Sequence, residues 1–248
     1  MNPLKVALVG YGRMGRETEA VLRERGHAAV PVLVGSPYPS QCVVGIDFTR
    51  GDDVPKNLKA ALAAGARYVI GTTGWDAHRG EVEALVKQRN GGVVHAANFS
   101  VGVNLFYRIV RDAAGALSRL PDYDPYVLER HHRQKKDAPS GTAKALAQIV
   151  ERAYAGKRKP AEQLQGGLPR DGFHVSALRA GGIVGDHTVG FDSGGDEILL
   201  EHRARSRRGF ALGAVLAAEW IATRNGFFSF EAVLDDLLRG SPGGARPS

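Results

Sequence analysis

Sulfur and long apolar runs are scarce in this chain. Its 248 residues include two methionines and one cysteine, Cys42. A single cysteine excludes a disulfide within the chain, and its place among valines, without an evident histidine partner, favours a buried structural thiol over a catalytic one. No apolar run reaches the ~20 residues of a membrane-spanning helix. Because residues 1–9 enter a strand-like run without a secretory signal, we expect a cytoplasmic protein with no membrane partner.

Positive charge exceeds negative charge. Lys and Arg number 33 against 26 Asp and Glu, a formal net charge of +7, and the isoelectric point is about 9.7. This balance fits either nucleic-acid binding or a small anionic substrate. The arginines are spread along the chain, and the dense clusters at 130–136 and 203–208 are better explained by a substrate site. We therefore expect no nucleic-acid partner.

Strand-like and helix-like patterns alternate through the first hundred residues. Segments with helical spacing and short turns separate apolar runs at residues 4–9, 29–34, 43–48, 68–70 and 93–96. This alternation predicts an α/β protein whose N-terminal part is a Rossmann-type, doubly wound parallel sheet with helices on both faces.

The rhythm changes after residue 100. Helical spacing continues at residues 104–117, 143–150 and 211–218. Two segments are polar, residues 155–169 and 240–248. Strands are predicted at 126–129, 173–177, 187–191 and 198–202, with a hairpin-like turn at 193–196. These patterns predict a C-terminal α+β domain with a mixed or antiparallel sheet.

A glycine-rich turn follows the first predicted strand. It is the run Gly10-Tyr11-Gly12-Arg13-Met14-Gly15. Gly10 would permit a tight turn, Gly12 a close approach of a pyrophosphate, and Gly15 close packing of helix on strand. The N-terminus of the following helix favours negative charge. In this context the motif predicts a dinucleotide site, against the alternative of an ordinary glycine-rich turn.

Two later strand ends carry residues suited to the same ligand. They are Gly71-Thr72-Thr73-Gly74 and Ala97-Asn98-Phe99-Ser100. In a doubly wound sheet such turns line the ligand crevice. The threonine hydroxyls could reach a ribose or the nicotinamide carboxamide. Asn98 could bind an amide, and Phe99 could pack against a ring. The alternative is that both runs are ordinary turns.

The end of the second predicted strand bears on the choice of cofactor. Residues 34–37, Val-Gly-Ser-Pro, contain no Asp or Glu to bind the adenosine ribose, which counts against a strict preference for NAD. Ser36 and Arg13 could meet a 2′-phosphate instead. We expect NADPH or NADH, with a slight preference for NADPH.

A basic run is the most informative segment for chemistry. It reads His131-His132-Arg133-Gln134-Lys135-Lys136-Asp137-Ala138-Pro139-Ser140-Gly141-Thr142. Ser140 suits a helix start, and Gly141 and Thr142 leave the first N–H groups accessible to a carboxylate. We expect neighbouring cations to crowd Lys135 and make it a better proton donor. Either histidine could move a proton near neutral pH; a solvated basic loop is the alternative.

No metal is expected. Adjacent histidine side chains in an extended segment point apart, and the single cysteine and scattered histidines offer no ligand spacing.

Together these residues resemble the dihydrodipicolinate reductase family, also called 4-hydroxy-tetrahydrodipicolinate reductases, of bacterial lysine and diaminopimelate synthesis. The resemblance covers nearly the whole chain. Besides the glycine-rich turn and the two strand-end runs quoted above, it is carried by Asp47-Phe48-Thr49, Val101-Gly102-Val103-Asn104, Glu129 through Ala143, Arg179-Ala180-Gly181, Ile183-Val184-Gly185 and Glu201-His202-Arg203-Ala204.

The resemblance implies roles for individual residues. Reduced NAD or NADP would deliver hydride to an unsaturated cyclic dicarboxylate. His131 matches a proton donor or acceptor, and Lys135 the general acid that protonates the ring. The residues matching the substrate site are His132, Ser140, Gly141, Thr142 and, near the edge of the substrate domain, Arg207. Those matching the cofactor contacts are the glycine loop, Gly71, Thr72, Thr73, Ala96, Ala97, Asn98 and Phe99.

The resemblance also implies an organisation. Residues 1–100 would bind the dinucleotide, with helices of 211–248 packing back on them, and residues 101–210 would bind substrate and form a homotetramer through their sheet. Two departures concern the adenosine end of the cofactor: the glycine loop is one residue shorter than in many members, and the second-to-third strand segment is abbreviated. The competing hypotheses are a nicotinamide dehydrogenase for an amino acid or sugar, and a non-catalytic nucleotide-sensing or nucleic-acid-binding protein.

Overall fold

The structure is a computed structural model that describes residues 2–33, 35–162, 164 and 166–240. The predicted strand end at Val34 and the tail beyond residue 240 therefore lie outside the described residues. The chain forms two compact units. One comprises the described residues up to Val101 and from Arg208 onward, and the other comprises Gly102–Arg207.

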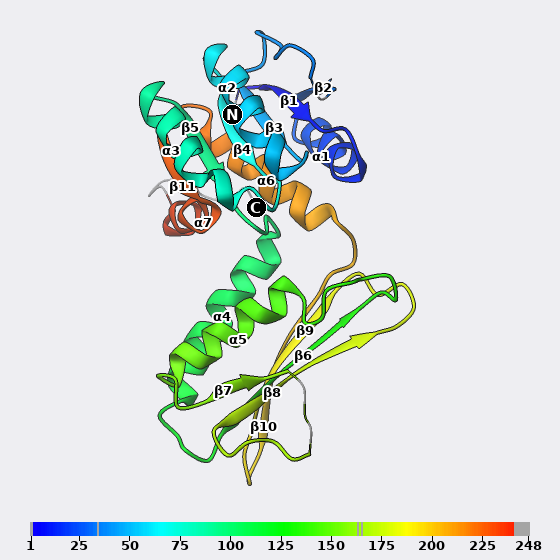
Figure 1. The fold of residues 1–248 in the computed structure, drawn as a ribbon, viewed down its shortest axis with the longest axis vertical. Helices are drawn as coiled ribbons and strands as arrows, with labels where there is room; N and C mark the ends of the chain where they lie inside the picture. The colour runs from blue at the N-terminus through cyan, green and yellow to red at the C-terminus, as the bar shows by residue number, and fades with distance from the viewer. Residues whose placement is uncertain (1, 34, 163, 165, 241–248) are drawn as a thin grey trace, which may run out of the picture. The chain divides into compact units, whose positions relative to one another are not determined.

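The first unit is built on a parallel sheet (Figure 1). Its strands are β1 (Lys5–Val9), β2 (Ala28–Val32), β3 (Val44–Asp47), β4 (Arg67–Ile70), β5 (Gly92–His95) and β11 (Gly226–Ser229), in the order β11-β5-β4-β3-β1-β2. Every neighbouring pair is parallel. Strands covered on both faces are continuously apolar, as residues 6–9 and 68–70 show by their burial. The prediction of a Rossmann-type sheet is confirmed.

Helices cover both faces of this sheet. They are α1 (Arg13–Glu24), α2 (Val54–Ala63), α3 (Arg79–Gln88), α6 (Arg208–Ile221) and α7 (Phe230–Arg239). Helices α1, α6 and α7 share one apolar core with the sheet, while α2 and α3 share the other. Short 3-10 turns at Gly51–Asp53 and Asp76–His78 lead into α2 and α3.

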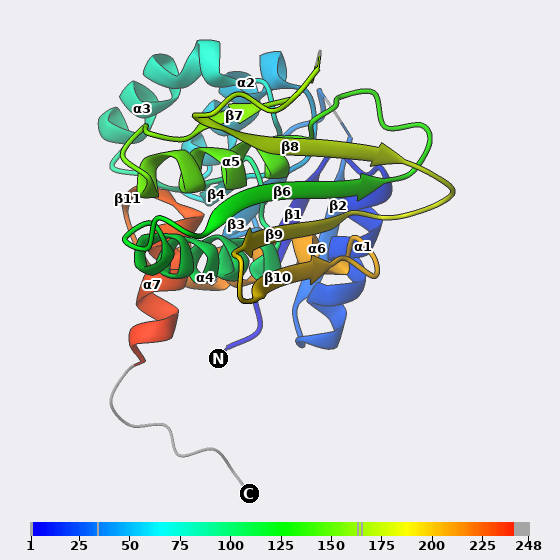
Figure 2. The ribbon, with the colours of Figure 1, turned by 90° about the horizontal axis from the view of Figure 1, so that it is seen from below.

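The second unit has a mixed sheet of five strands. They are β6 (Asp124–His131), β7 (Lys159–Ala161), β8 (Gly172–Arg179), β9 (Asp186–Asp192) and β10 (Glu197–Arg203), in the order β10-β9-β6-β8-β7. Strand β6 is parallel to β8 and antiparallel to β9. Helices α4 (Val101–Leu117) and α5 (Gly141–Ala153) pack on one face, behind the strands in Figure 2. The predicted mixed sheet and the turn at 193–196 are confirmed.

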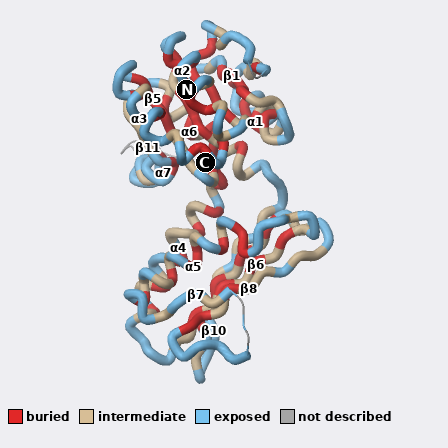
Figure 3. The backbone as a smooth tube through the Cα atoms, in the orientation of Figure 1, coloured by how far each residue is buried: buried red, intermediate tan, exposed pale blue. Residues whose placement is uncertain are grey.

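Buried positions gather in the interior of each unit (Figure 3). Along β6 burial alternates, with Val127, Glu129 and His131 on the covered face. The period of two therefore places a carboxylate and an imidazole, i and i+2, beside each other under the helices. No helix within the described ranges combines the length and apolarity that a bilayer crossing requires.

Candidate active site

The predicted cofactor residues share one edge of the parallel sheet. The carboxyl ends of β1, β4 and β5 lead into residues 10–15, 71–74 and 96–99 respectively. Strand order reverses beside β1, because β2 lies on one side of it and β3 on the other. Ligands of open parallel sheets bind at such a reversal, and the glycine turn stands there.

The three glycines of this turn differ in their surroundings. Gly10 has φ of +88°, and a Cβ on it would lie 2.7 Å from the Phe48 carbonyl oxygen. A Cβ on Gly15 would lie 2.7 Å from the Gly10 carbonyl oxygen, whereas one on Gly12 would meet nothing within 4 Å. Gly10 and Gly15 are thus required by packing, but the space over Gly12 is open and fits an approaching diphosphate.

The helix start beside this turn has no side-chain cap. Gly12 is the N-cap of α1 and provides no side chain to bind the N–H groups of the first turn. Such groups suit an anion. Arg13 is exposed and Met14 half-buried, while the Tyr11 hydroxyl donates to Glu19. Ser36 is exposed as well, and its N–H donates to the Leu33 carbonyl at 3.0 Å.

Thr72 has a structural partner that the sequence did not suggest. Its hydroxyl donates to Asp47 Oδ1 at 2.9 Å and accepts from the Thr49 N–H at 2.8 Å. Asp47 is fully buried and also accepts from Thr49, Asn57 and Tyr68. The hydroxyl of Thr72 is therefore engaged in joining the ends of β3 and β4. Exposed Thr73 remains the hydroxyl suited to a ligand.

Phe99 also has a partner that the sequence did not suggest. Its side chain is 2 % exposed, and its ring packs on Phe230 with 4.9 Å between centroids. The ring therefore belongs to the apolar core, and contact between Phe99 and the cofactor stays a prediction. Asn98 Oδ1 accepts from the Ser100 N–H at 2.8 Å; Ala96 is half-buried and Ala97 exposed.

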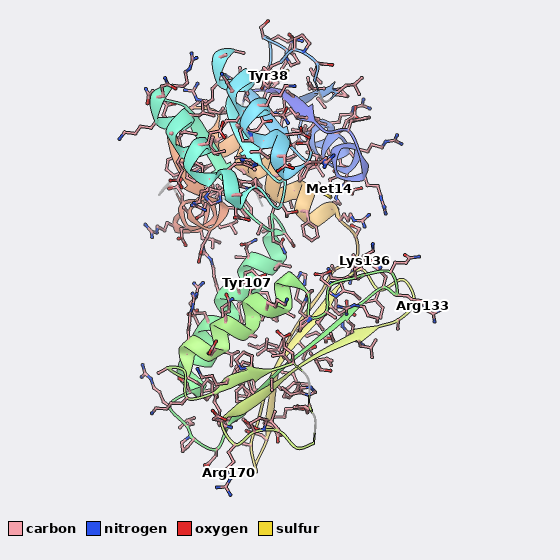
Figure 4. All side chains as sticks on the ribbon, in the orientation of Figure 1. Met14, Tyr38, Tyr107, Arg133, Lys136 and Arg170 are labelled. Carbon is pink, nitrogen blue, oxygen red and sulfur yellow. The ribbon has the colours of Figure 1, made fainter. Side chains whose placement is uncertain are left out.

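The basic run lies at one end of the second unit. Strands β6, β8 and β10 all end there, because both β6 and β10 are antiparallel to β9 and β8 is parallel to β6. The start of α5 follows the run, and Arg207 follows β10 as an exposed residue. Figure 4 shows Arg133 and Lys136 at this end and Arg170 at the opposite end. The topology thus brings the predicted substrate residues to one end of the sheet.

The start of α5 is capped as predicted. The Ser140 side chain accepts from the Ala143 N–H at 3.2 Å. Gly141 is exposed and Thr142 half-buried. Burial raises the pKa of Tyr107, whose side chain is hydrogen-bonded to Thr142. This first turn of α5 can bind a carboxylate through its N–H groups.

Glu129 organises the buried side of this end. Its carboxylate accepts from His131 Nδ1, from Arg179 Nη2 at 2.7 Å and from the Ser140 N–H at 3.1 Å. Burial alone would raise the pKa of Glu129, but the hydrogen bonds from His131 and Arg179 outweigh it and lower the pKa to about 2. Neither Glu129 nor Arg179 was assigned a role from the sequence, although both stand in runs that carry the resemblance.

His187 is a third imidazole at this site, also without a predicted role. Its Nε2 lies 3.3 Å from Ser140 Oγ, and its ring meets that of His131 edge-on with 5.2 Å between centroids. Burial, followed by the positive charge available at His131, lowers the pKa of His187 to about 4. It is therefore neutral at physiological pH. The strand period at 187–191 was the available signal, since it places His187 on the covered face.

Glu129, His131 and His187 are residue types that bind metals, and one ligand atom of each lies within 4.8 Å of the others. The Glu129 carboxylate, however, already accepts three hydrogen bonds, one from the cationic Arg179. A guanidinium at this distance opposes a metal cation. We assign these residues to a hydrogen-bonded network rather than to a metal.

Lys135 has an anionic neighbour in its own loop. Its Nζ lies 2.7 Å from Asp137 Oδ1, and this hydrogen bond lowers the pKa of Asp137. The turn after His132 folds the Asp137 carboxylate onto the ammonium, a partner that the sequence did not suggest. His132 is half-buried, and its Nδ1 has no hydrogen-bond partner among the described residues.

Comparison with known proteins identifies the family of this chain. A family model described as Dihydrodipicolinate reductase, C-terminus, matches residues 102–234, and its N-terminus counterpart matches residues 37–99. The chain belongs to the dihydrodipicolinate reductase family. It is 36 % identical over 242 residues to the 4-hydroxy-tetrahydrodipicolinate reductase of Christiangramia forsetii, covering 95 % of this chain and 100 % of that one. It is 45 % identical over 195 residues to that of Methanocorpusculum labreanum, covering 77 % and 75 %.

Solved structures show the same fold. Dipicolinate-bound dihydrodipicolinate reductase from Paenisporosarcina sp. TG-14 matches with a TM-score of 0.75 and 23 % identity, over 93 % of this chain and 99 % of that one. An amine dehydrogenase from Mycobacterium smegmatis has a TM-score of 0.59 at 10 % identity, over 93 % and 96 %. The activity of this family member is that of a 4-hydroxy-tetrahydrodipicolinate reductase in lysine biosynthesis, and the family uses NAD(P)H.

Proposed function

We propose that the dihydrodipicolinate-type ring binds at the basic end of the second unit and that Lys135 protonates it. Bound NAD(P)H supplies the hydride. The observation that carries the proposal is the combination of the first turn of α5 with the Lys135 ammonium in the loop that precedes it. N–H groups bind a substrate carboxylate, and an ammonium returns a proton to the ring once hydride has added negative charge.

Each remaining residue of this end has a distinct task. The first turn, Ser140, Gly141 and Thr142, binds one carboxylate, and His132 donates to it. Arg207, exposed at the same end, supports the charge of a substrate with two carboxylates. His131 holds a proton at Nδ1 toward Glu129 and exchanges one at Nε2.

We assign the cofactor to the strand-end edge of the first unit, in residues 1–100, on which the helices of 211–248 pack. The open space over Gly12 and the uncapped start of α1 take the diphosphate. The backbone of the turns after β4 and β5, together with Thr73, contacts the nicotinamide half. Exposed Arg13 and Ser36 give a slight preference for NADPH over NADH by meeting the 2′-phosphate.

A coupled assay with freshly generated substrate tests the function. Loss of reduced-cofactor absorbance is followed with NADPH and NADH in turn. Lys135→Ala should lower kcat about 10²-fold or more, as loss of a general acid commonly does, with cofactor affinity unchanged. The matched control is Lys136→Ala, an exposed lysine next in sequence. Equal turnover in both variants would refute the role of Lys135.

Cofactor preference needs a separate measurement. Arg13→Ala should raise the KM for NADPH more than the KM for NADH, because only NADPH carries the 2′-phosphate that the guanidinium meets. Equal changes for both nucleotides would contradict the preference.

We further propose a homotetramer formed through the uncovered face of the mixed sheet. Helices α4 and α5 cover the opposite face. Leu178 and Leu199 are 44 % and 54 % exposed, and the strand period places both on the uncovered face. Light scattering during size-exclusion chromatography should report four chains, and Leu199→Glu should reduce that number.

A further inference from the structure

Glu129 connects two parts of the proposed site through one buried carboxylate. One contact is with the imidazole of His131 and another with the backbone N–H of Ser140, the N-cap of α5. Arg179, on the neighbouring strand β8, holds the same carboxylate and also donates to the Asp137 carbonyl at 2.6 Å. A proton-exchanging group and the carboxylate-binding turn thus share one anchor.

The contact with His131 decides which of its nitrogens carries a proton. An ionised carboxylate can only accept a hydrogen bond, so Nδ1 must donate to it. A neutral His131 is then left with a lone pair on Nε2, and a second proton adds at that atom alone. A carboxylate that orients a histidine in this way also stabilises its protonated form.

The surroundings of Nε2 are consistent with this arrangement. A Cβ on Gly185 would lie 2.9 Å from His131 Nε2. Gly185 immediately precedes β9, and its carbonyl accepts from the Ala204 N–H at 2.9 Å, which fixes the segment in place. The absence of a side chain at Gly185 therefore keeps a Cβ atom from lying 2.9 Å from the outer nitrogen of His131.

Several charged or titratable groups surround His131 from the neighbouring elements. They are Glu129 on β6, Arg179 on β8, His187 on β9, and Lys135 in the following loop with its partner Asp137; His202 on β10 lies beyond His187. Glu129 is the one whose carboxylate touches His131 directly. Its removal should therefore change the behaviour of His131 more than the removal of any other carboxylate.

We propose that Glu129 is a positioning residue of the reductase. It fixes the Nδ1-protonated form of His131, directs proton exchange to Nε2, and holds the carboxylate-binding turn at Ser140 in register with that imidazole. This inference rests on the proposed function, in which His131 exchanges a proton during the reaction.

The central experiment is a double-mutant cycle read through pH profiles. Glu129→Gln keeps the shape of the side chain and removes its charge. We expect kcat/KM to fall at least about tenfold. One limb of the pH profile of kcat/KM should be absent in His131→Asn, and in Glu129→Gln we expect this limb to move by about one pH unit or more toward lower pH. The reason is that the protonated imidazole loses an adjacent opposite charge. In the His131→Asn background, Glu129→Gln should leave the pH profile of the residual activity unchanged.

Glu219→Gln is the matched control. Glu219 is likewise a buried carboxylate with a lowered pKa that accepts from an arginine and a histidine, Arg25 and His27. It lies in the first unit, in α6. The same chemical change there should leave the pH profile unshifted. An equal shift in Glu219→Gln would show that the effect is one of general stability and would overturn the proposal.

The outcomes separate this inference from the proposed function. If His131→Asn retains full activity, the proton role of His131 fails, and the positioning role fails with it. If His131→Asn loses activity while the pH profile of Glu129→Gln is unshifted, only the positioning role fails. Independent, multiplying losses in kcat in the double variant would also refute it, because the effect of Glu129 on proton exchange requires His131, whereas loss of the Ser140 contact acts on the KM for the dicarboxylate.

A second variant tests the same assignment where Glu129→Gln fails to fold by circular dichroism. Gly185→Ala places a methyl group 2.9 Å from Nε2. It should lower kcat about tenfold with little change in the KM for the cofactor. Gly182→Ala, whose methyl group would meet nothing within 4 Å, is the control. Unchanged kcat in a folded Gly185→Ala variant would show that Nε2 is not the exchanging atom.

Discussion

Lys135 and Asp137 form an ion pair within the loop between β6 and α5, with Nζ 2.7 Å from Oδ1. The carboxylate is about half exposed, so the pair adds little to stability. Its effect falls on the ammonium itself, which has an anion beside it before substrate arrives. A substrate carboxylate must then share or displace Asp137, and the pair becomes part of the binding step.

Asp137→Asn separates these effects. The ammonium loses its anionic neighbour, so we expect the alkaline limb of the pH profile of kcat to move to lower pH. The free energy of unfolding should change by less than about 1 kcal/mol. The KM for the dicarboxylate should fall, because an anion that competes for the ammonium has gone. Steady-state rates between pH 6 and 10 check both points. An unmoved limb together with an unchanged KM would contradict this role.

The glycine turn allows a test that distinguishes binding from folding. Gly12→Ala should fold normally, since a Cβ there meets nothing within 4 Å. Its methyl group stands where the diphosphate must approach, so the Kd for NADPH should rise about tenfold or more. Fluorescence titration measures the affinity and thermal unfolding the stability.

Gly10→Ala is the matched comparison in the same turn. At φ of +88° and with a Cβ 2.7 Å from the Phe48 carbonyl oxygen, alanine must strain or displace the backbone. We expect a clear loss of thermal stability. A destabilised Gly12→Ala together with a stable Gly10→Ala would contradict the assignment of Gly12 to cofactor binding and of Gly10 to packing.

Thr72 and Thr73 provide a similar contrast after β4. Thr72→Val removes a donor to the buried Asp47 carboxylate and should cost about 1–3 kcal/mol in the free energy of unfolding. Thr73→Val changes an exposed hydroxyl and should leave stability nearly unchanged while raising the KM for the cofactor. Urea unfolding measures the stability of both variants, and steady-state kinetics measure their KM for the cofactor. Equal stabilities would show that the Asp47 network does not depend on Thr72.

The fold and the positions of the site residues along the chain could be predicted from the sequence, but the hydrogen-bond and packing partners of their side chains could not. Alternating patterns located the strands, and glycine spacing located the turn after β1. β11 was not predicted, because four residues between two helices show no readable period. Thr72 and Phe99 were assigned to the cofactor from their place after a strand, whereas tertiary packing gives each a different neighbour.

The Glu129 network shows the same limit more sharply. Glu129 and His131 are two residues apart on one strand, so their shared face was visible in the sequence. Arg179 and His187 come from β8 and β9, and only strand pairing brings them to that carboxylate. Their register could not be deduced from local patterns, because both strands have similar apolar alternation.

The buried His187 should make stability depend on pH. Its pKa is lowered to about 4 in the folded protein by burial and by His131, whereas an unfolded histidine titrates at about 6.5. Between these values the unfolded chain binds the extra proton, so the free energy of unfolding should fall as pH drops from about 6.5 to about 4. Glu129, with its pKa lowered to about 2, adds a further loss below about pH 4.5 by the same linkage.

His187→Gln isolates the first window. The amide keeps hydrogen-bonding capacity near Ser140 Oγ but does not titrate. The decline in the free energy of unfolding between pH 6.5 and 4.5 should therefore become shallower, by the equivalent of one proton, than in the wild-type protein. Urea unfolding at half-unit intervals of pH measures the slope. Half-buried His174 provides the control, since His174→Gln removes a histidine from the other face of the sheet, where it is partly open to solvent. An equal flattening in both variants would mean that the decline does not arise from the buried imidazole.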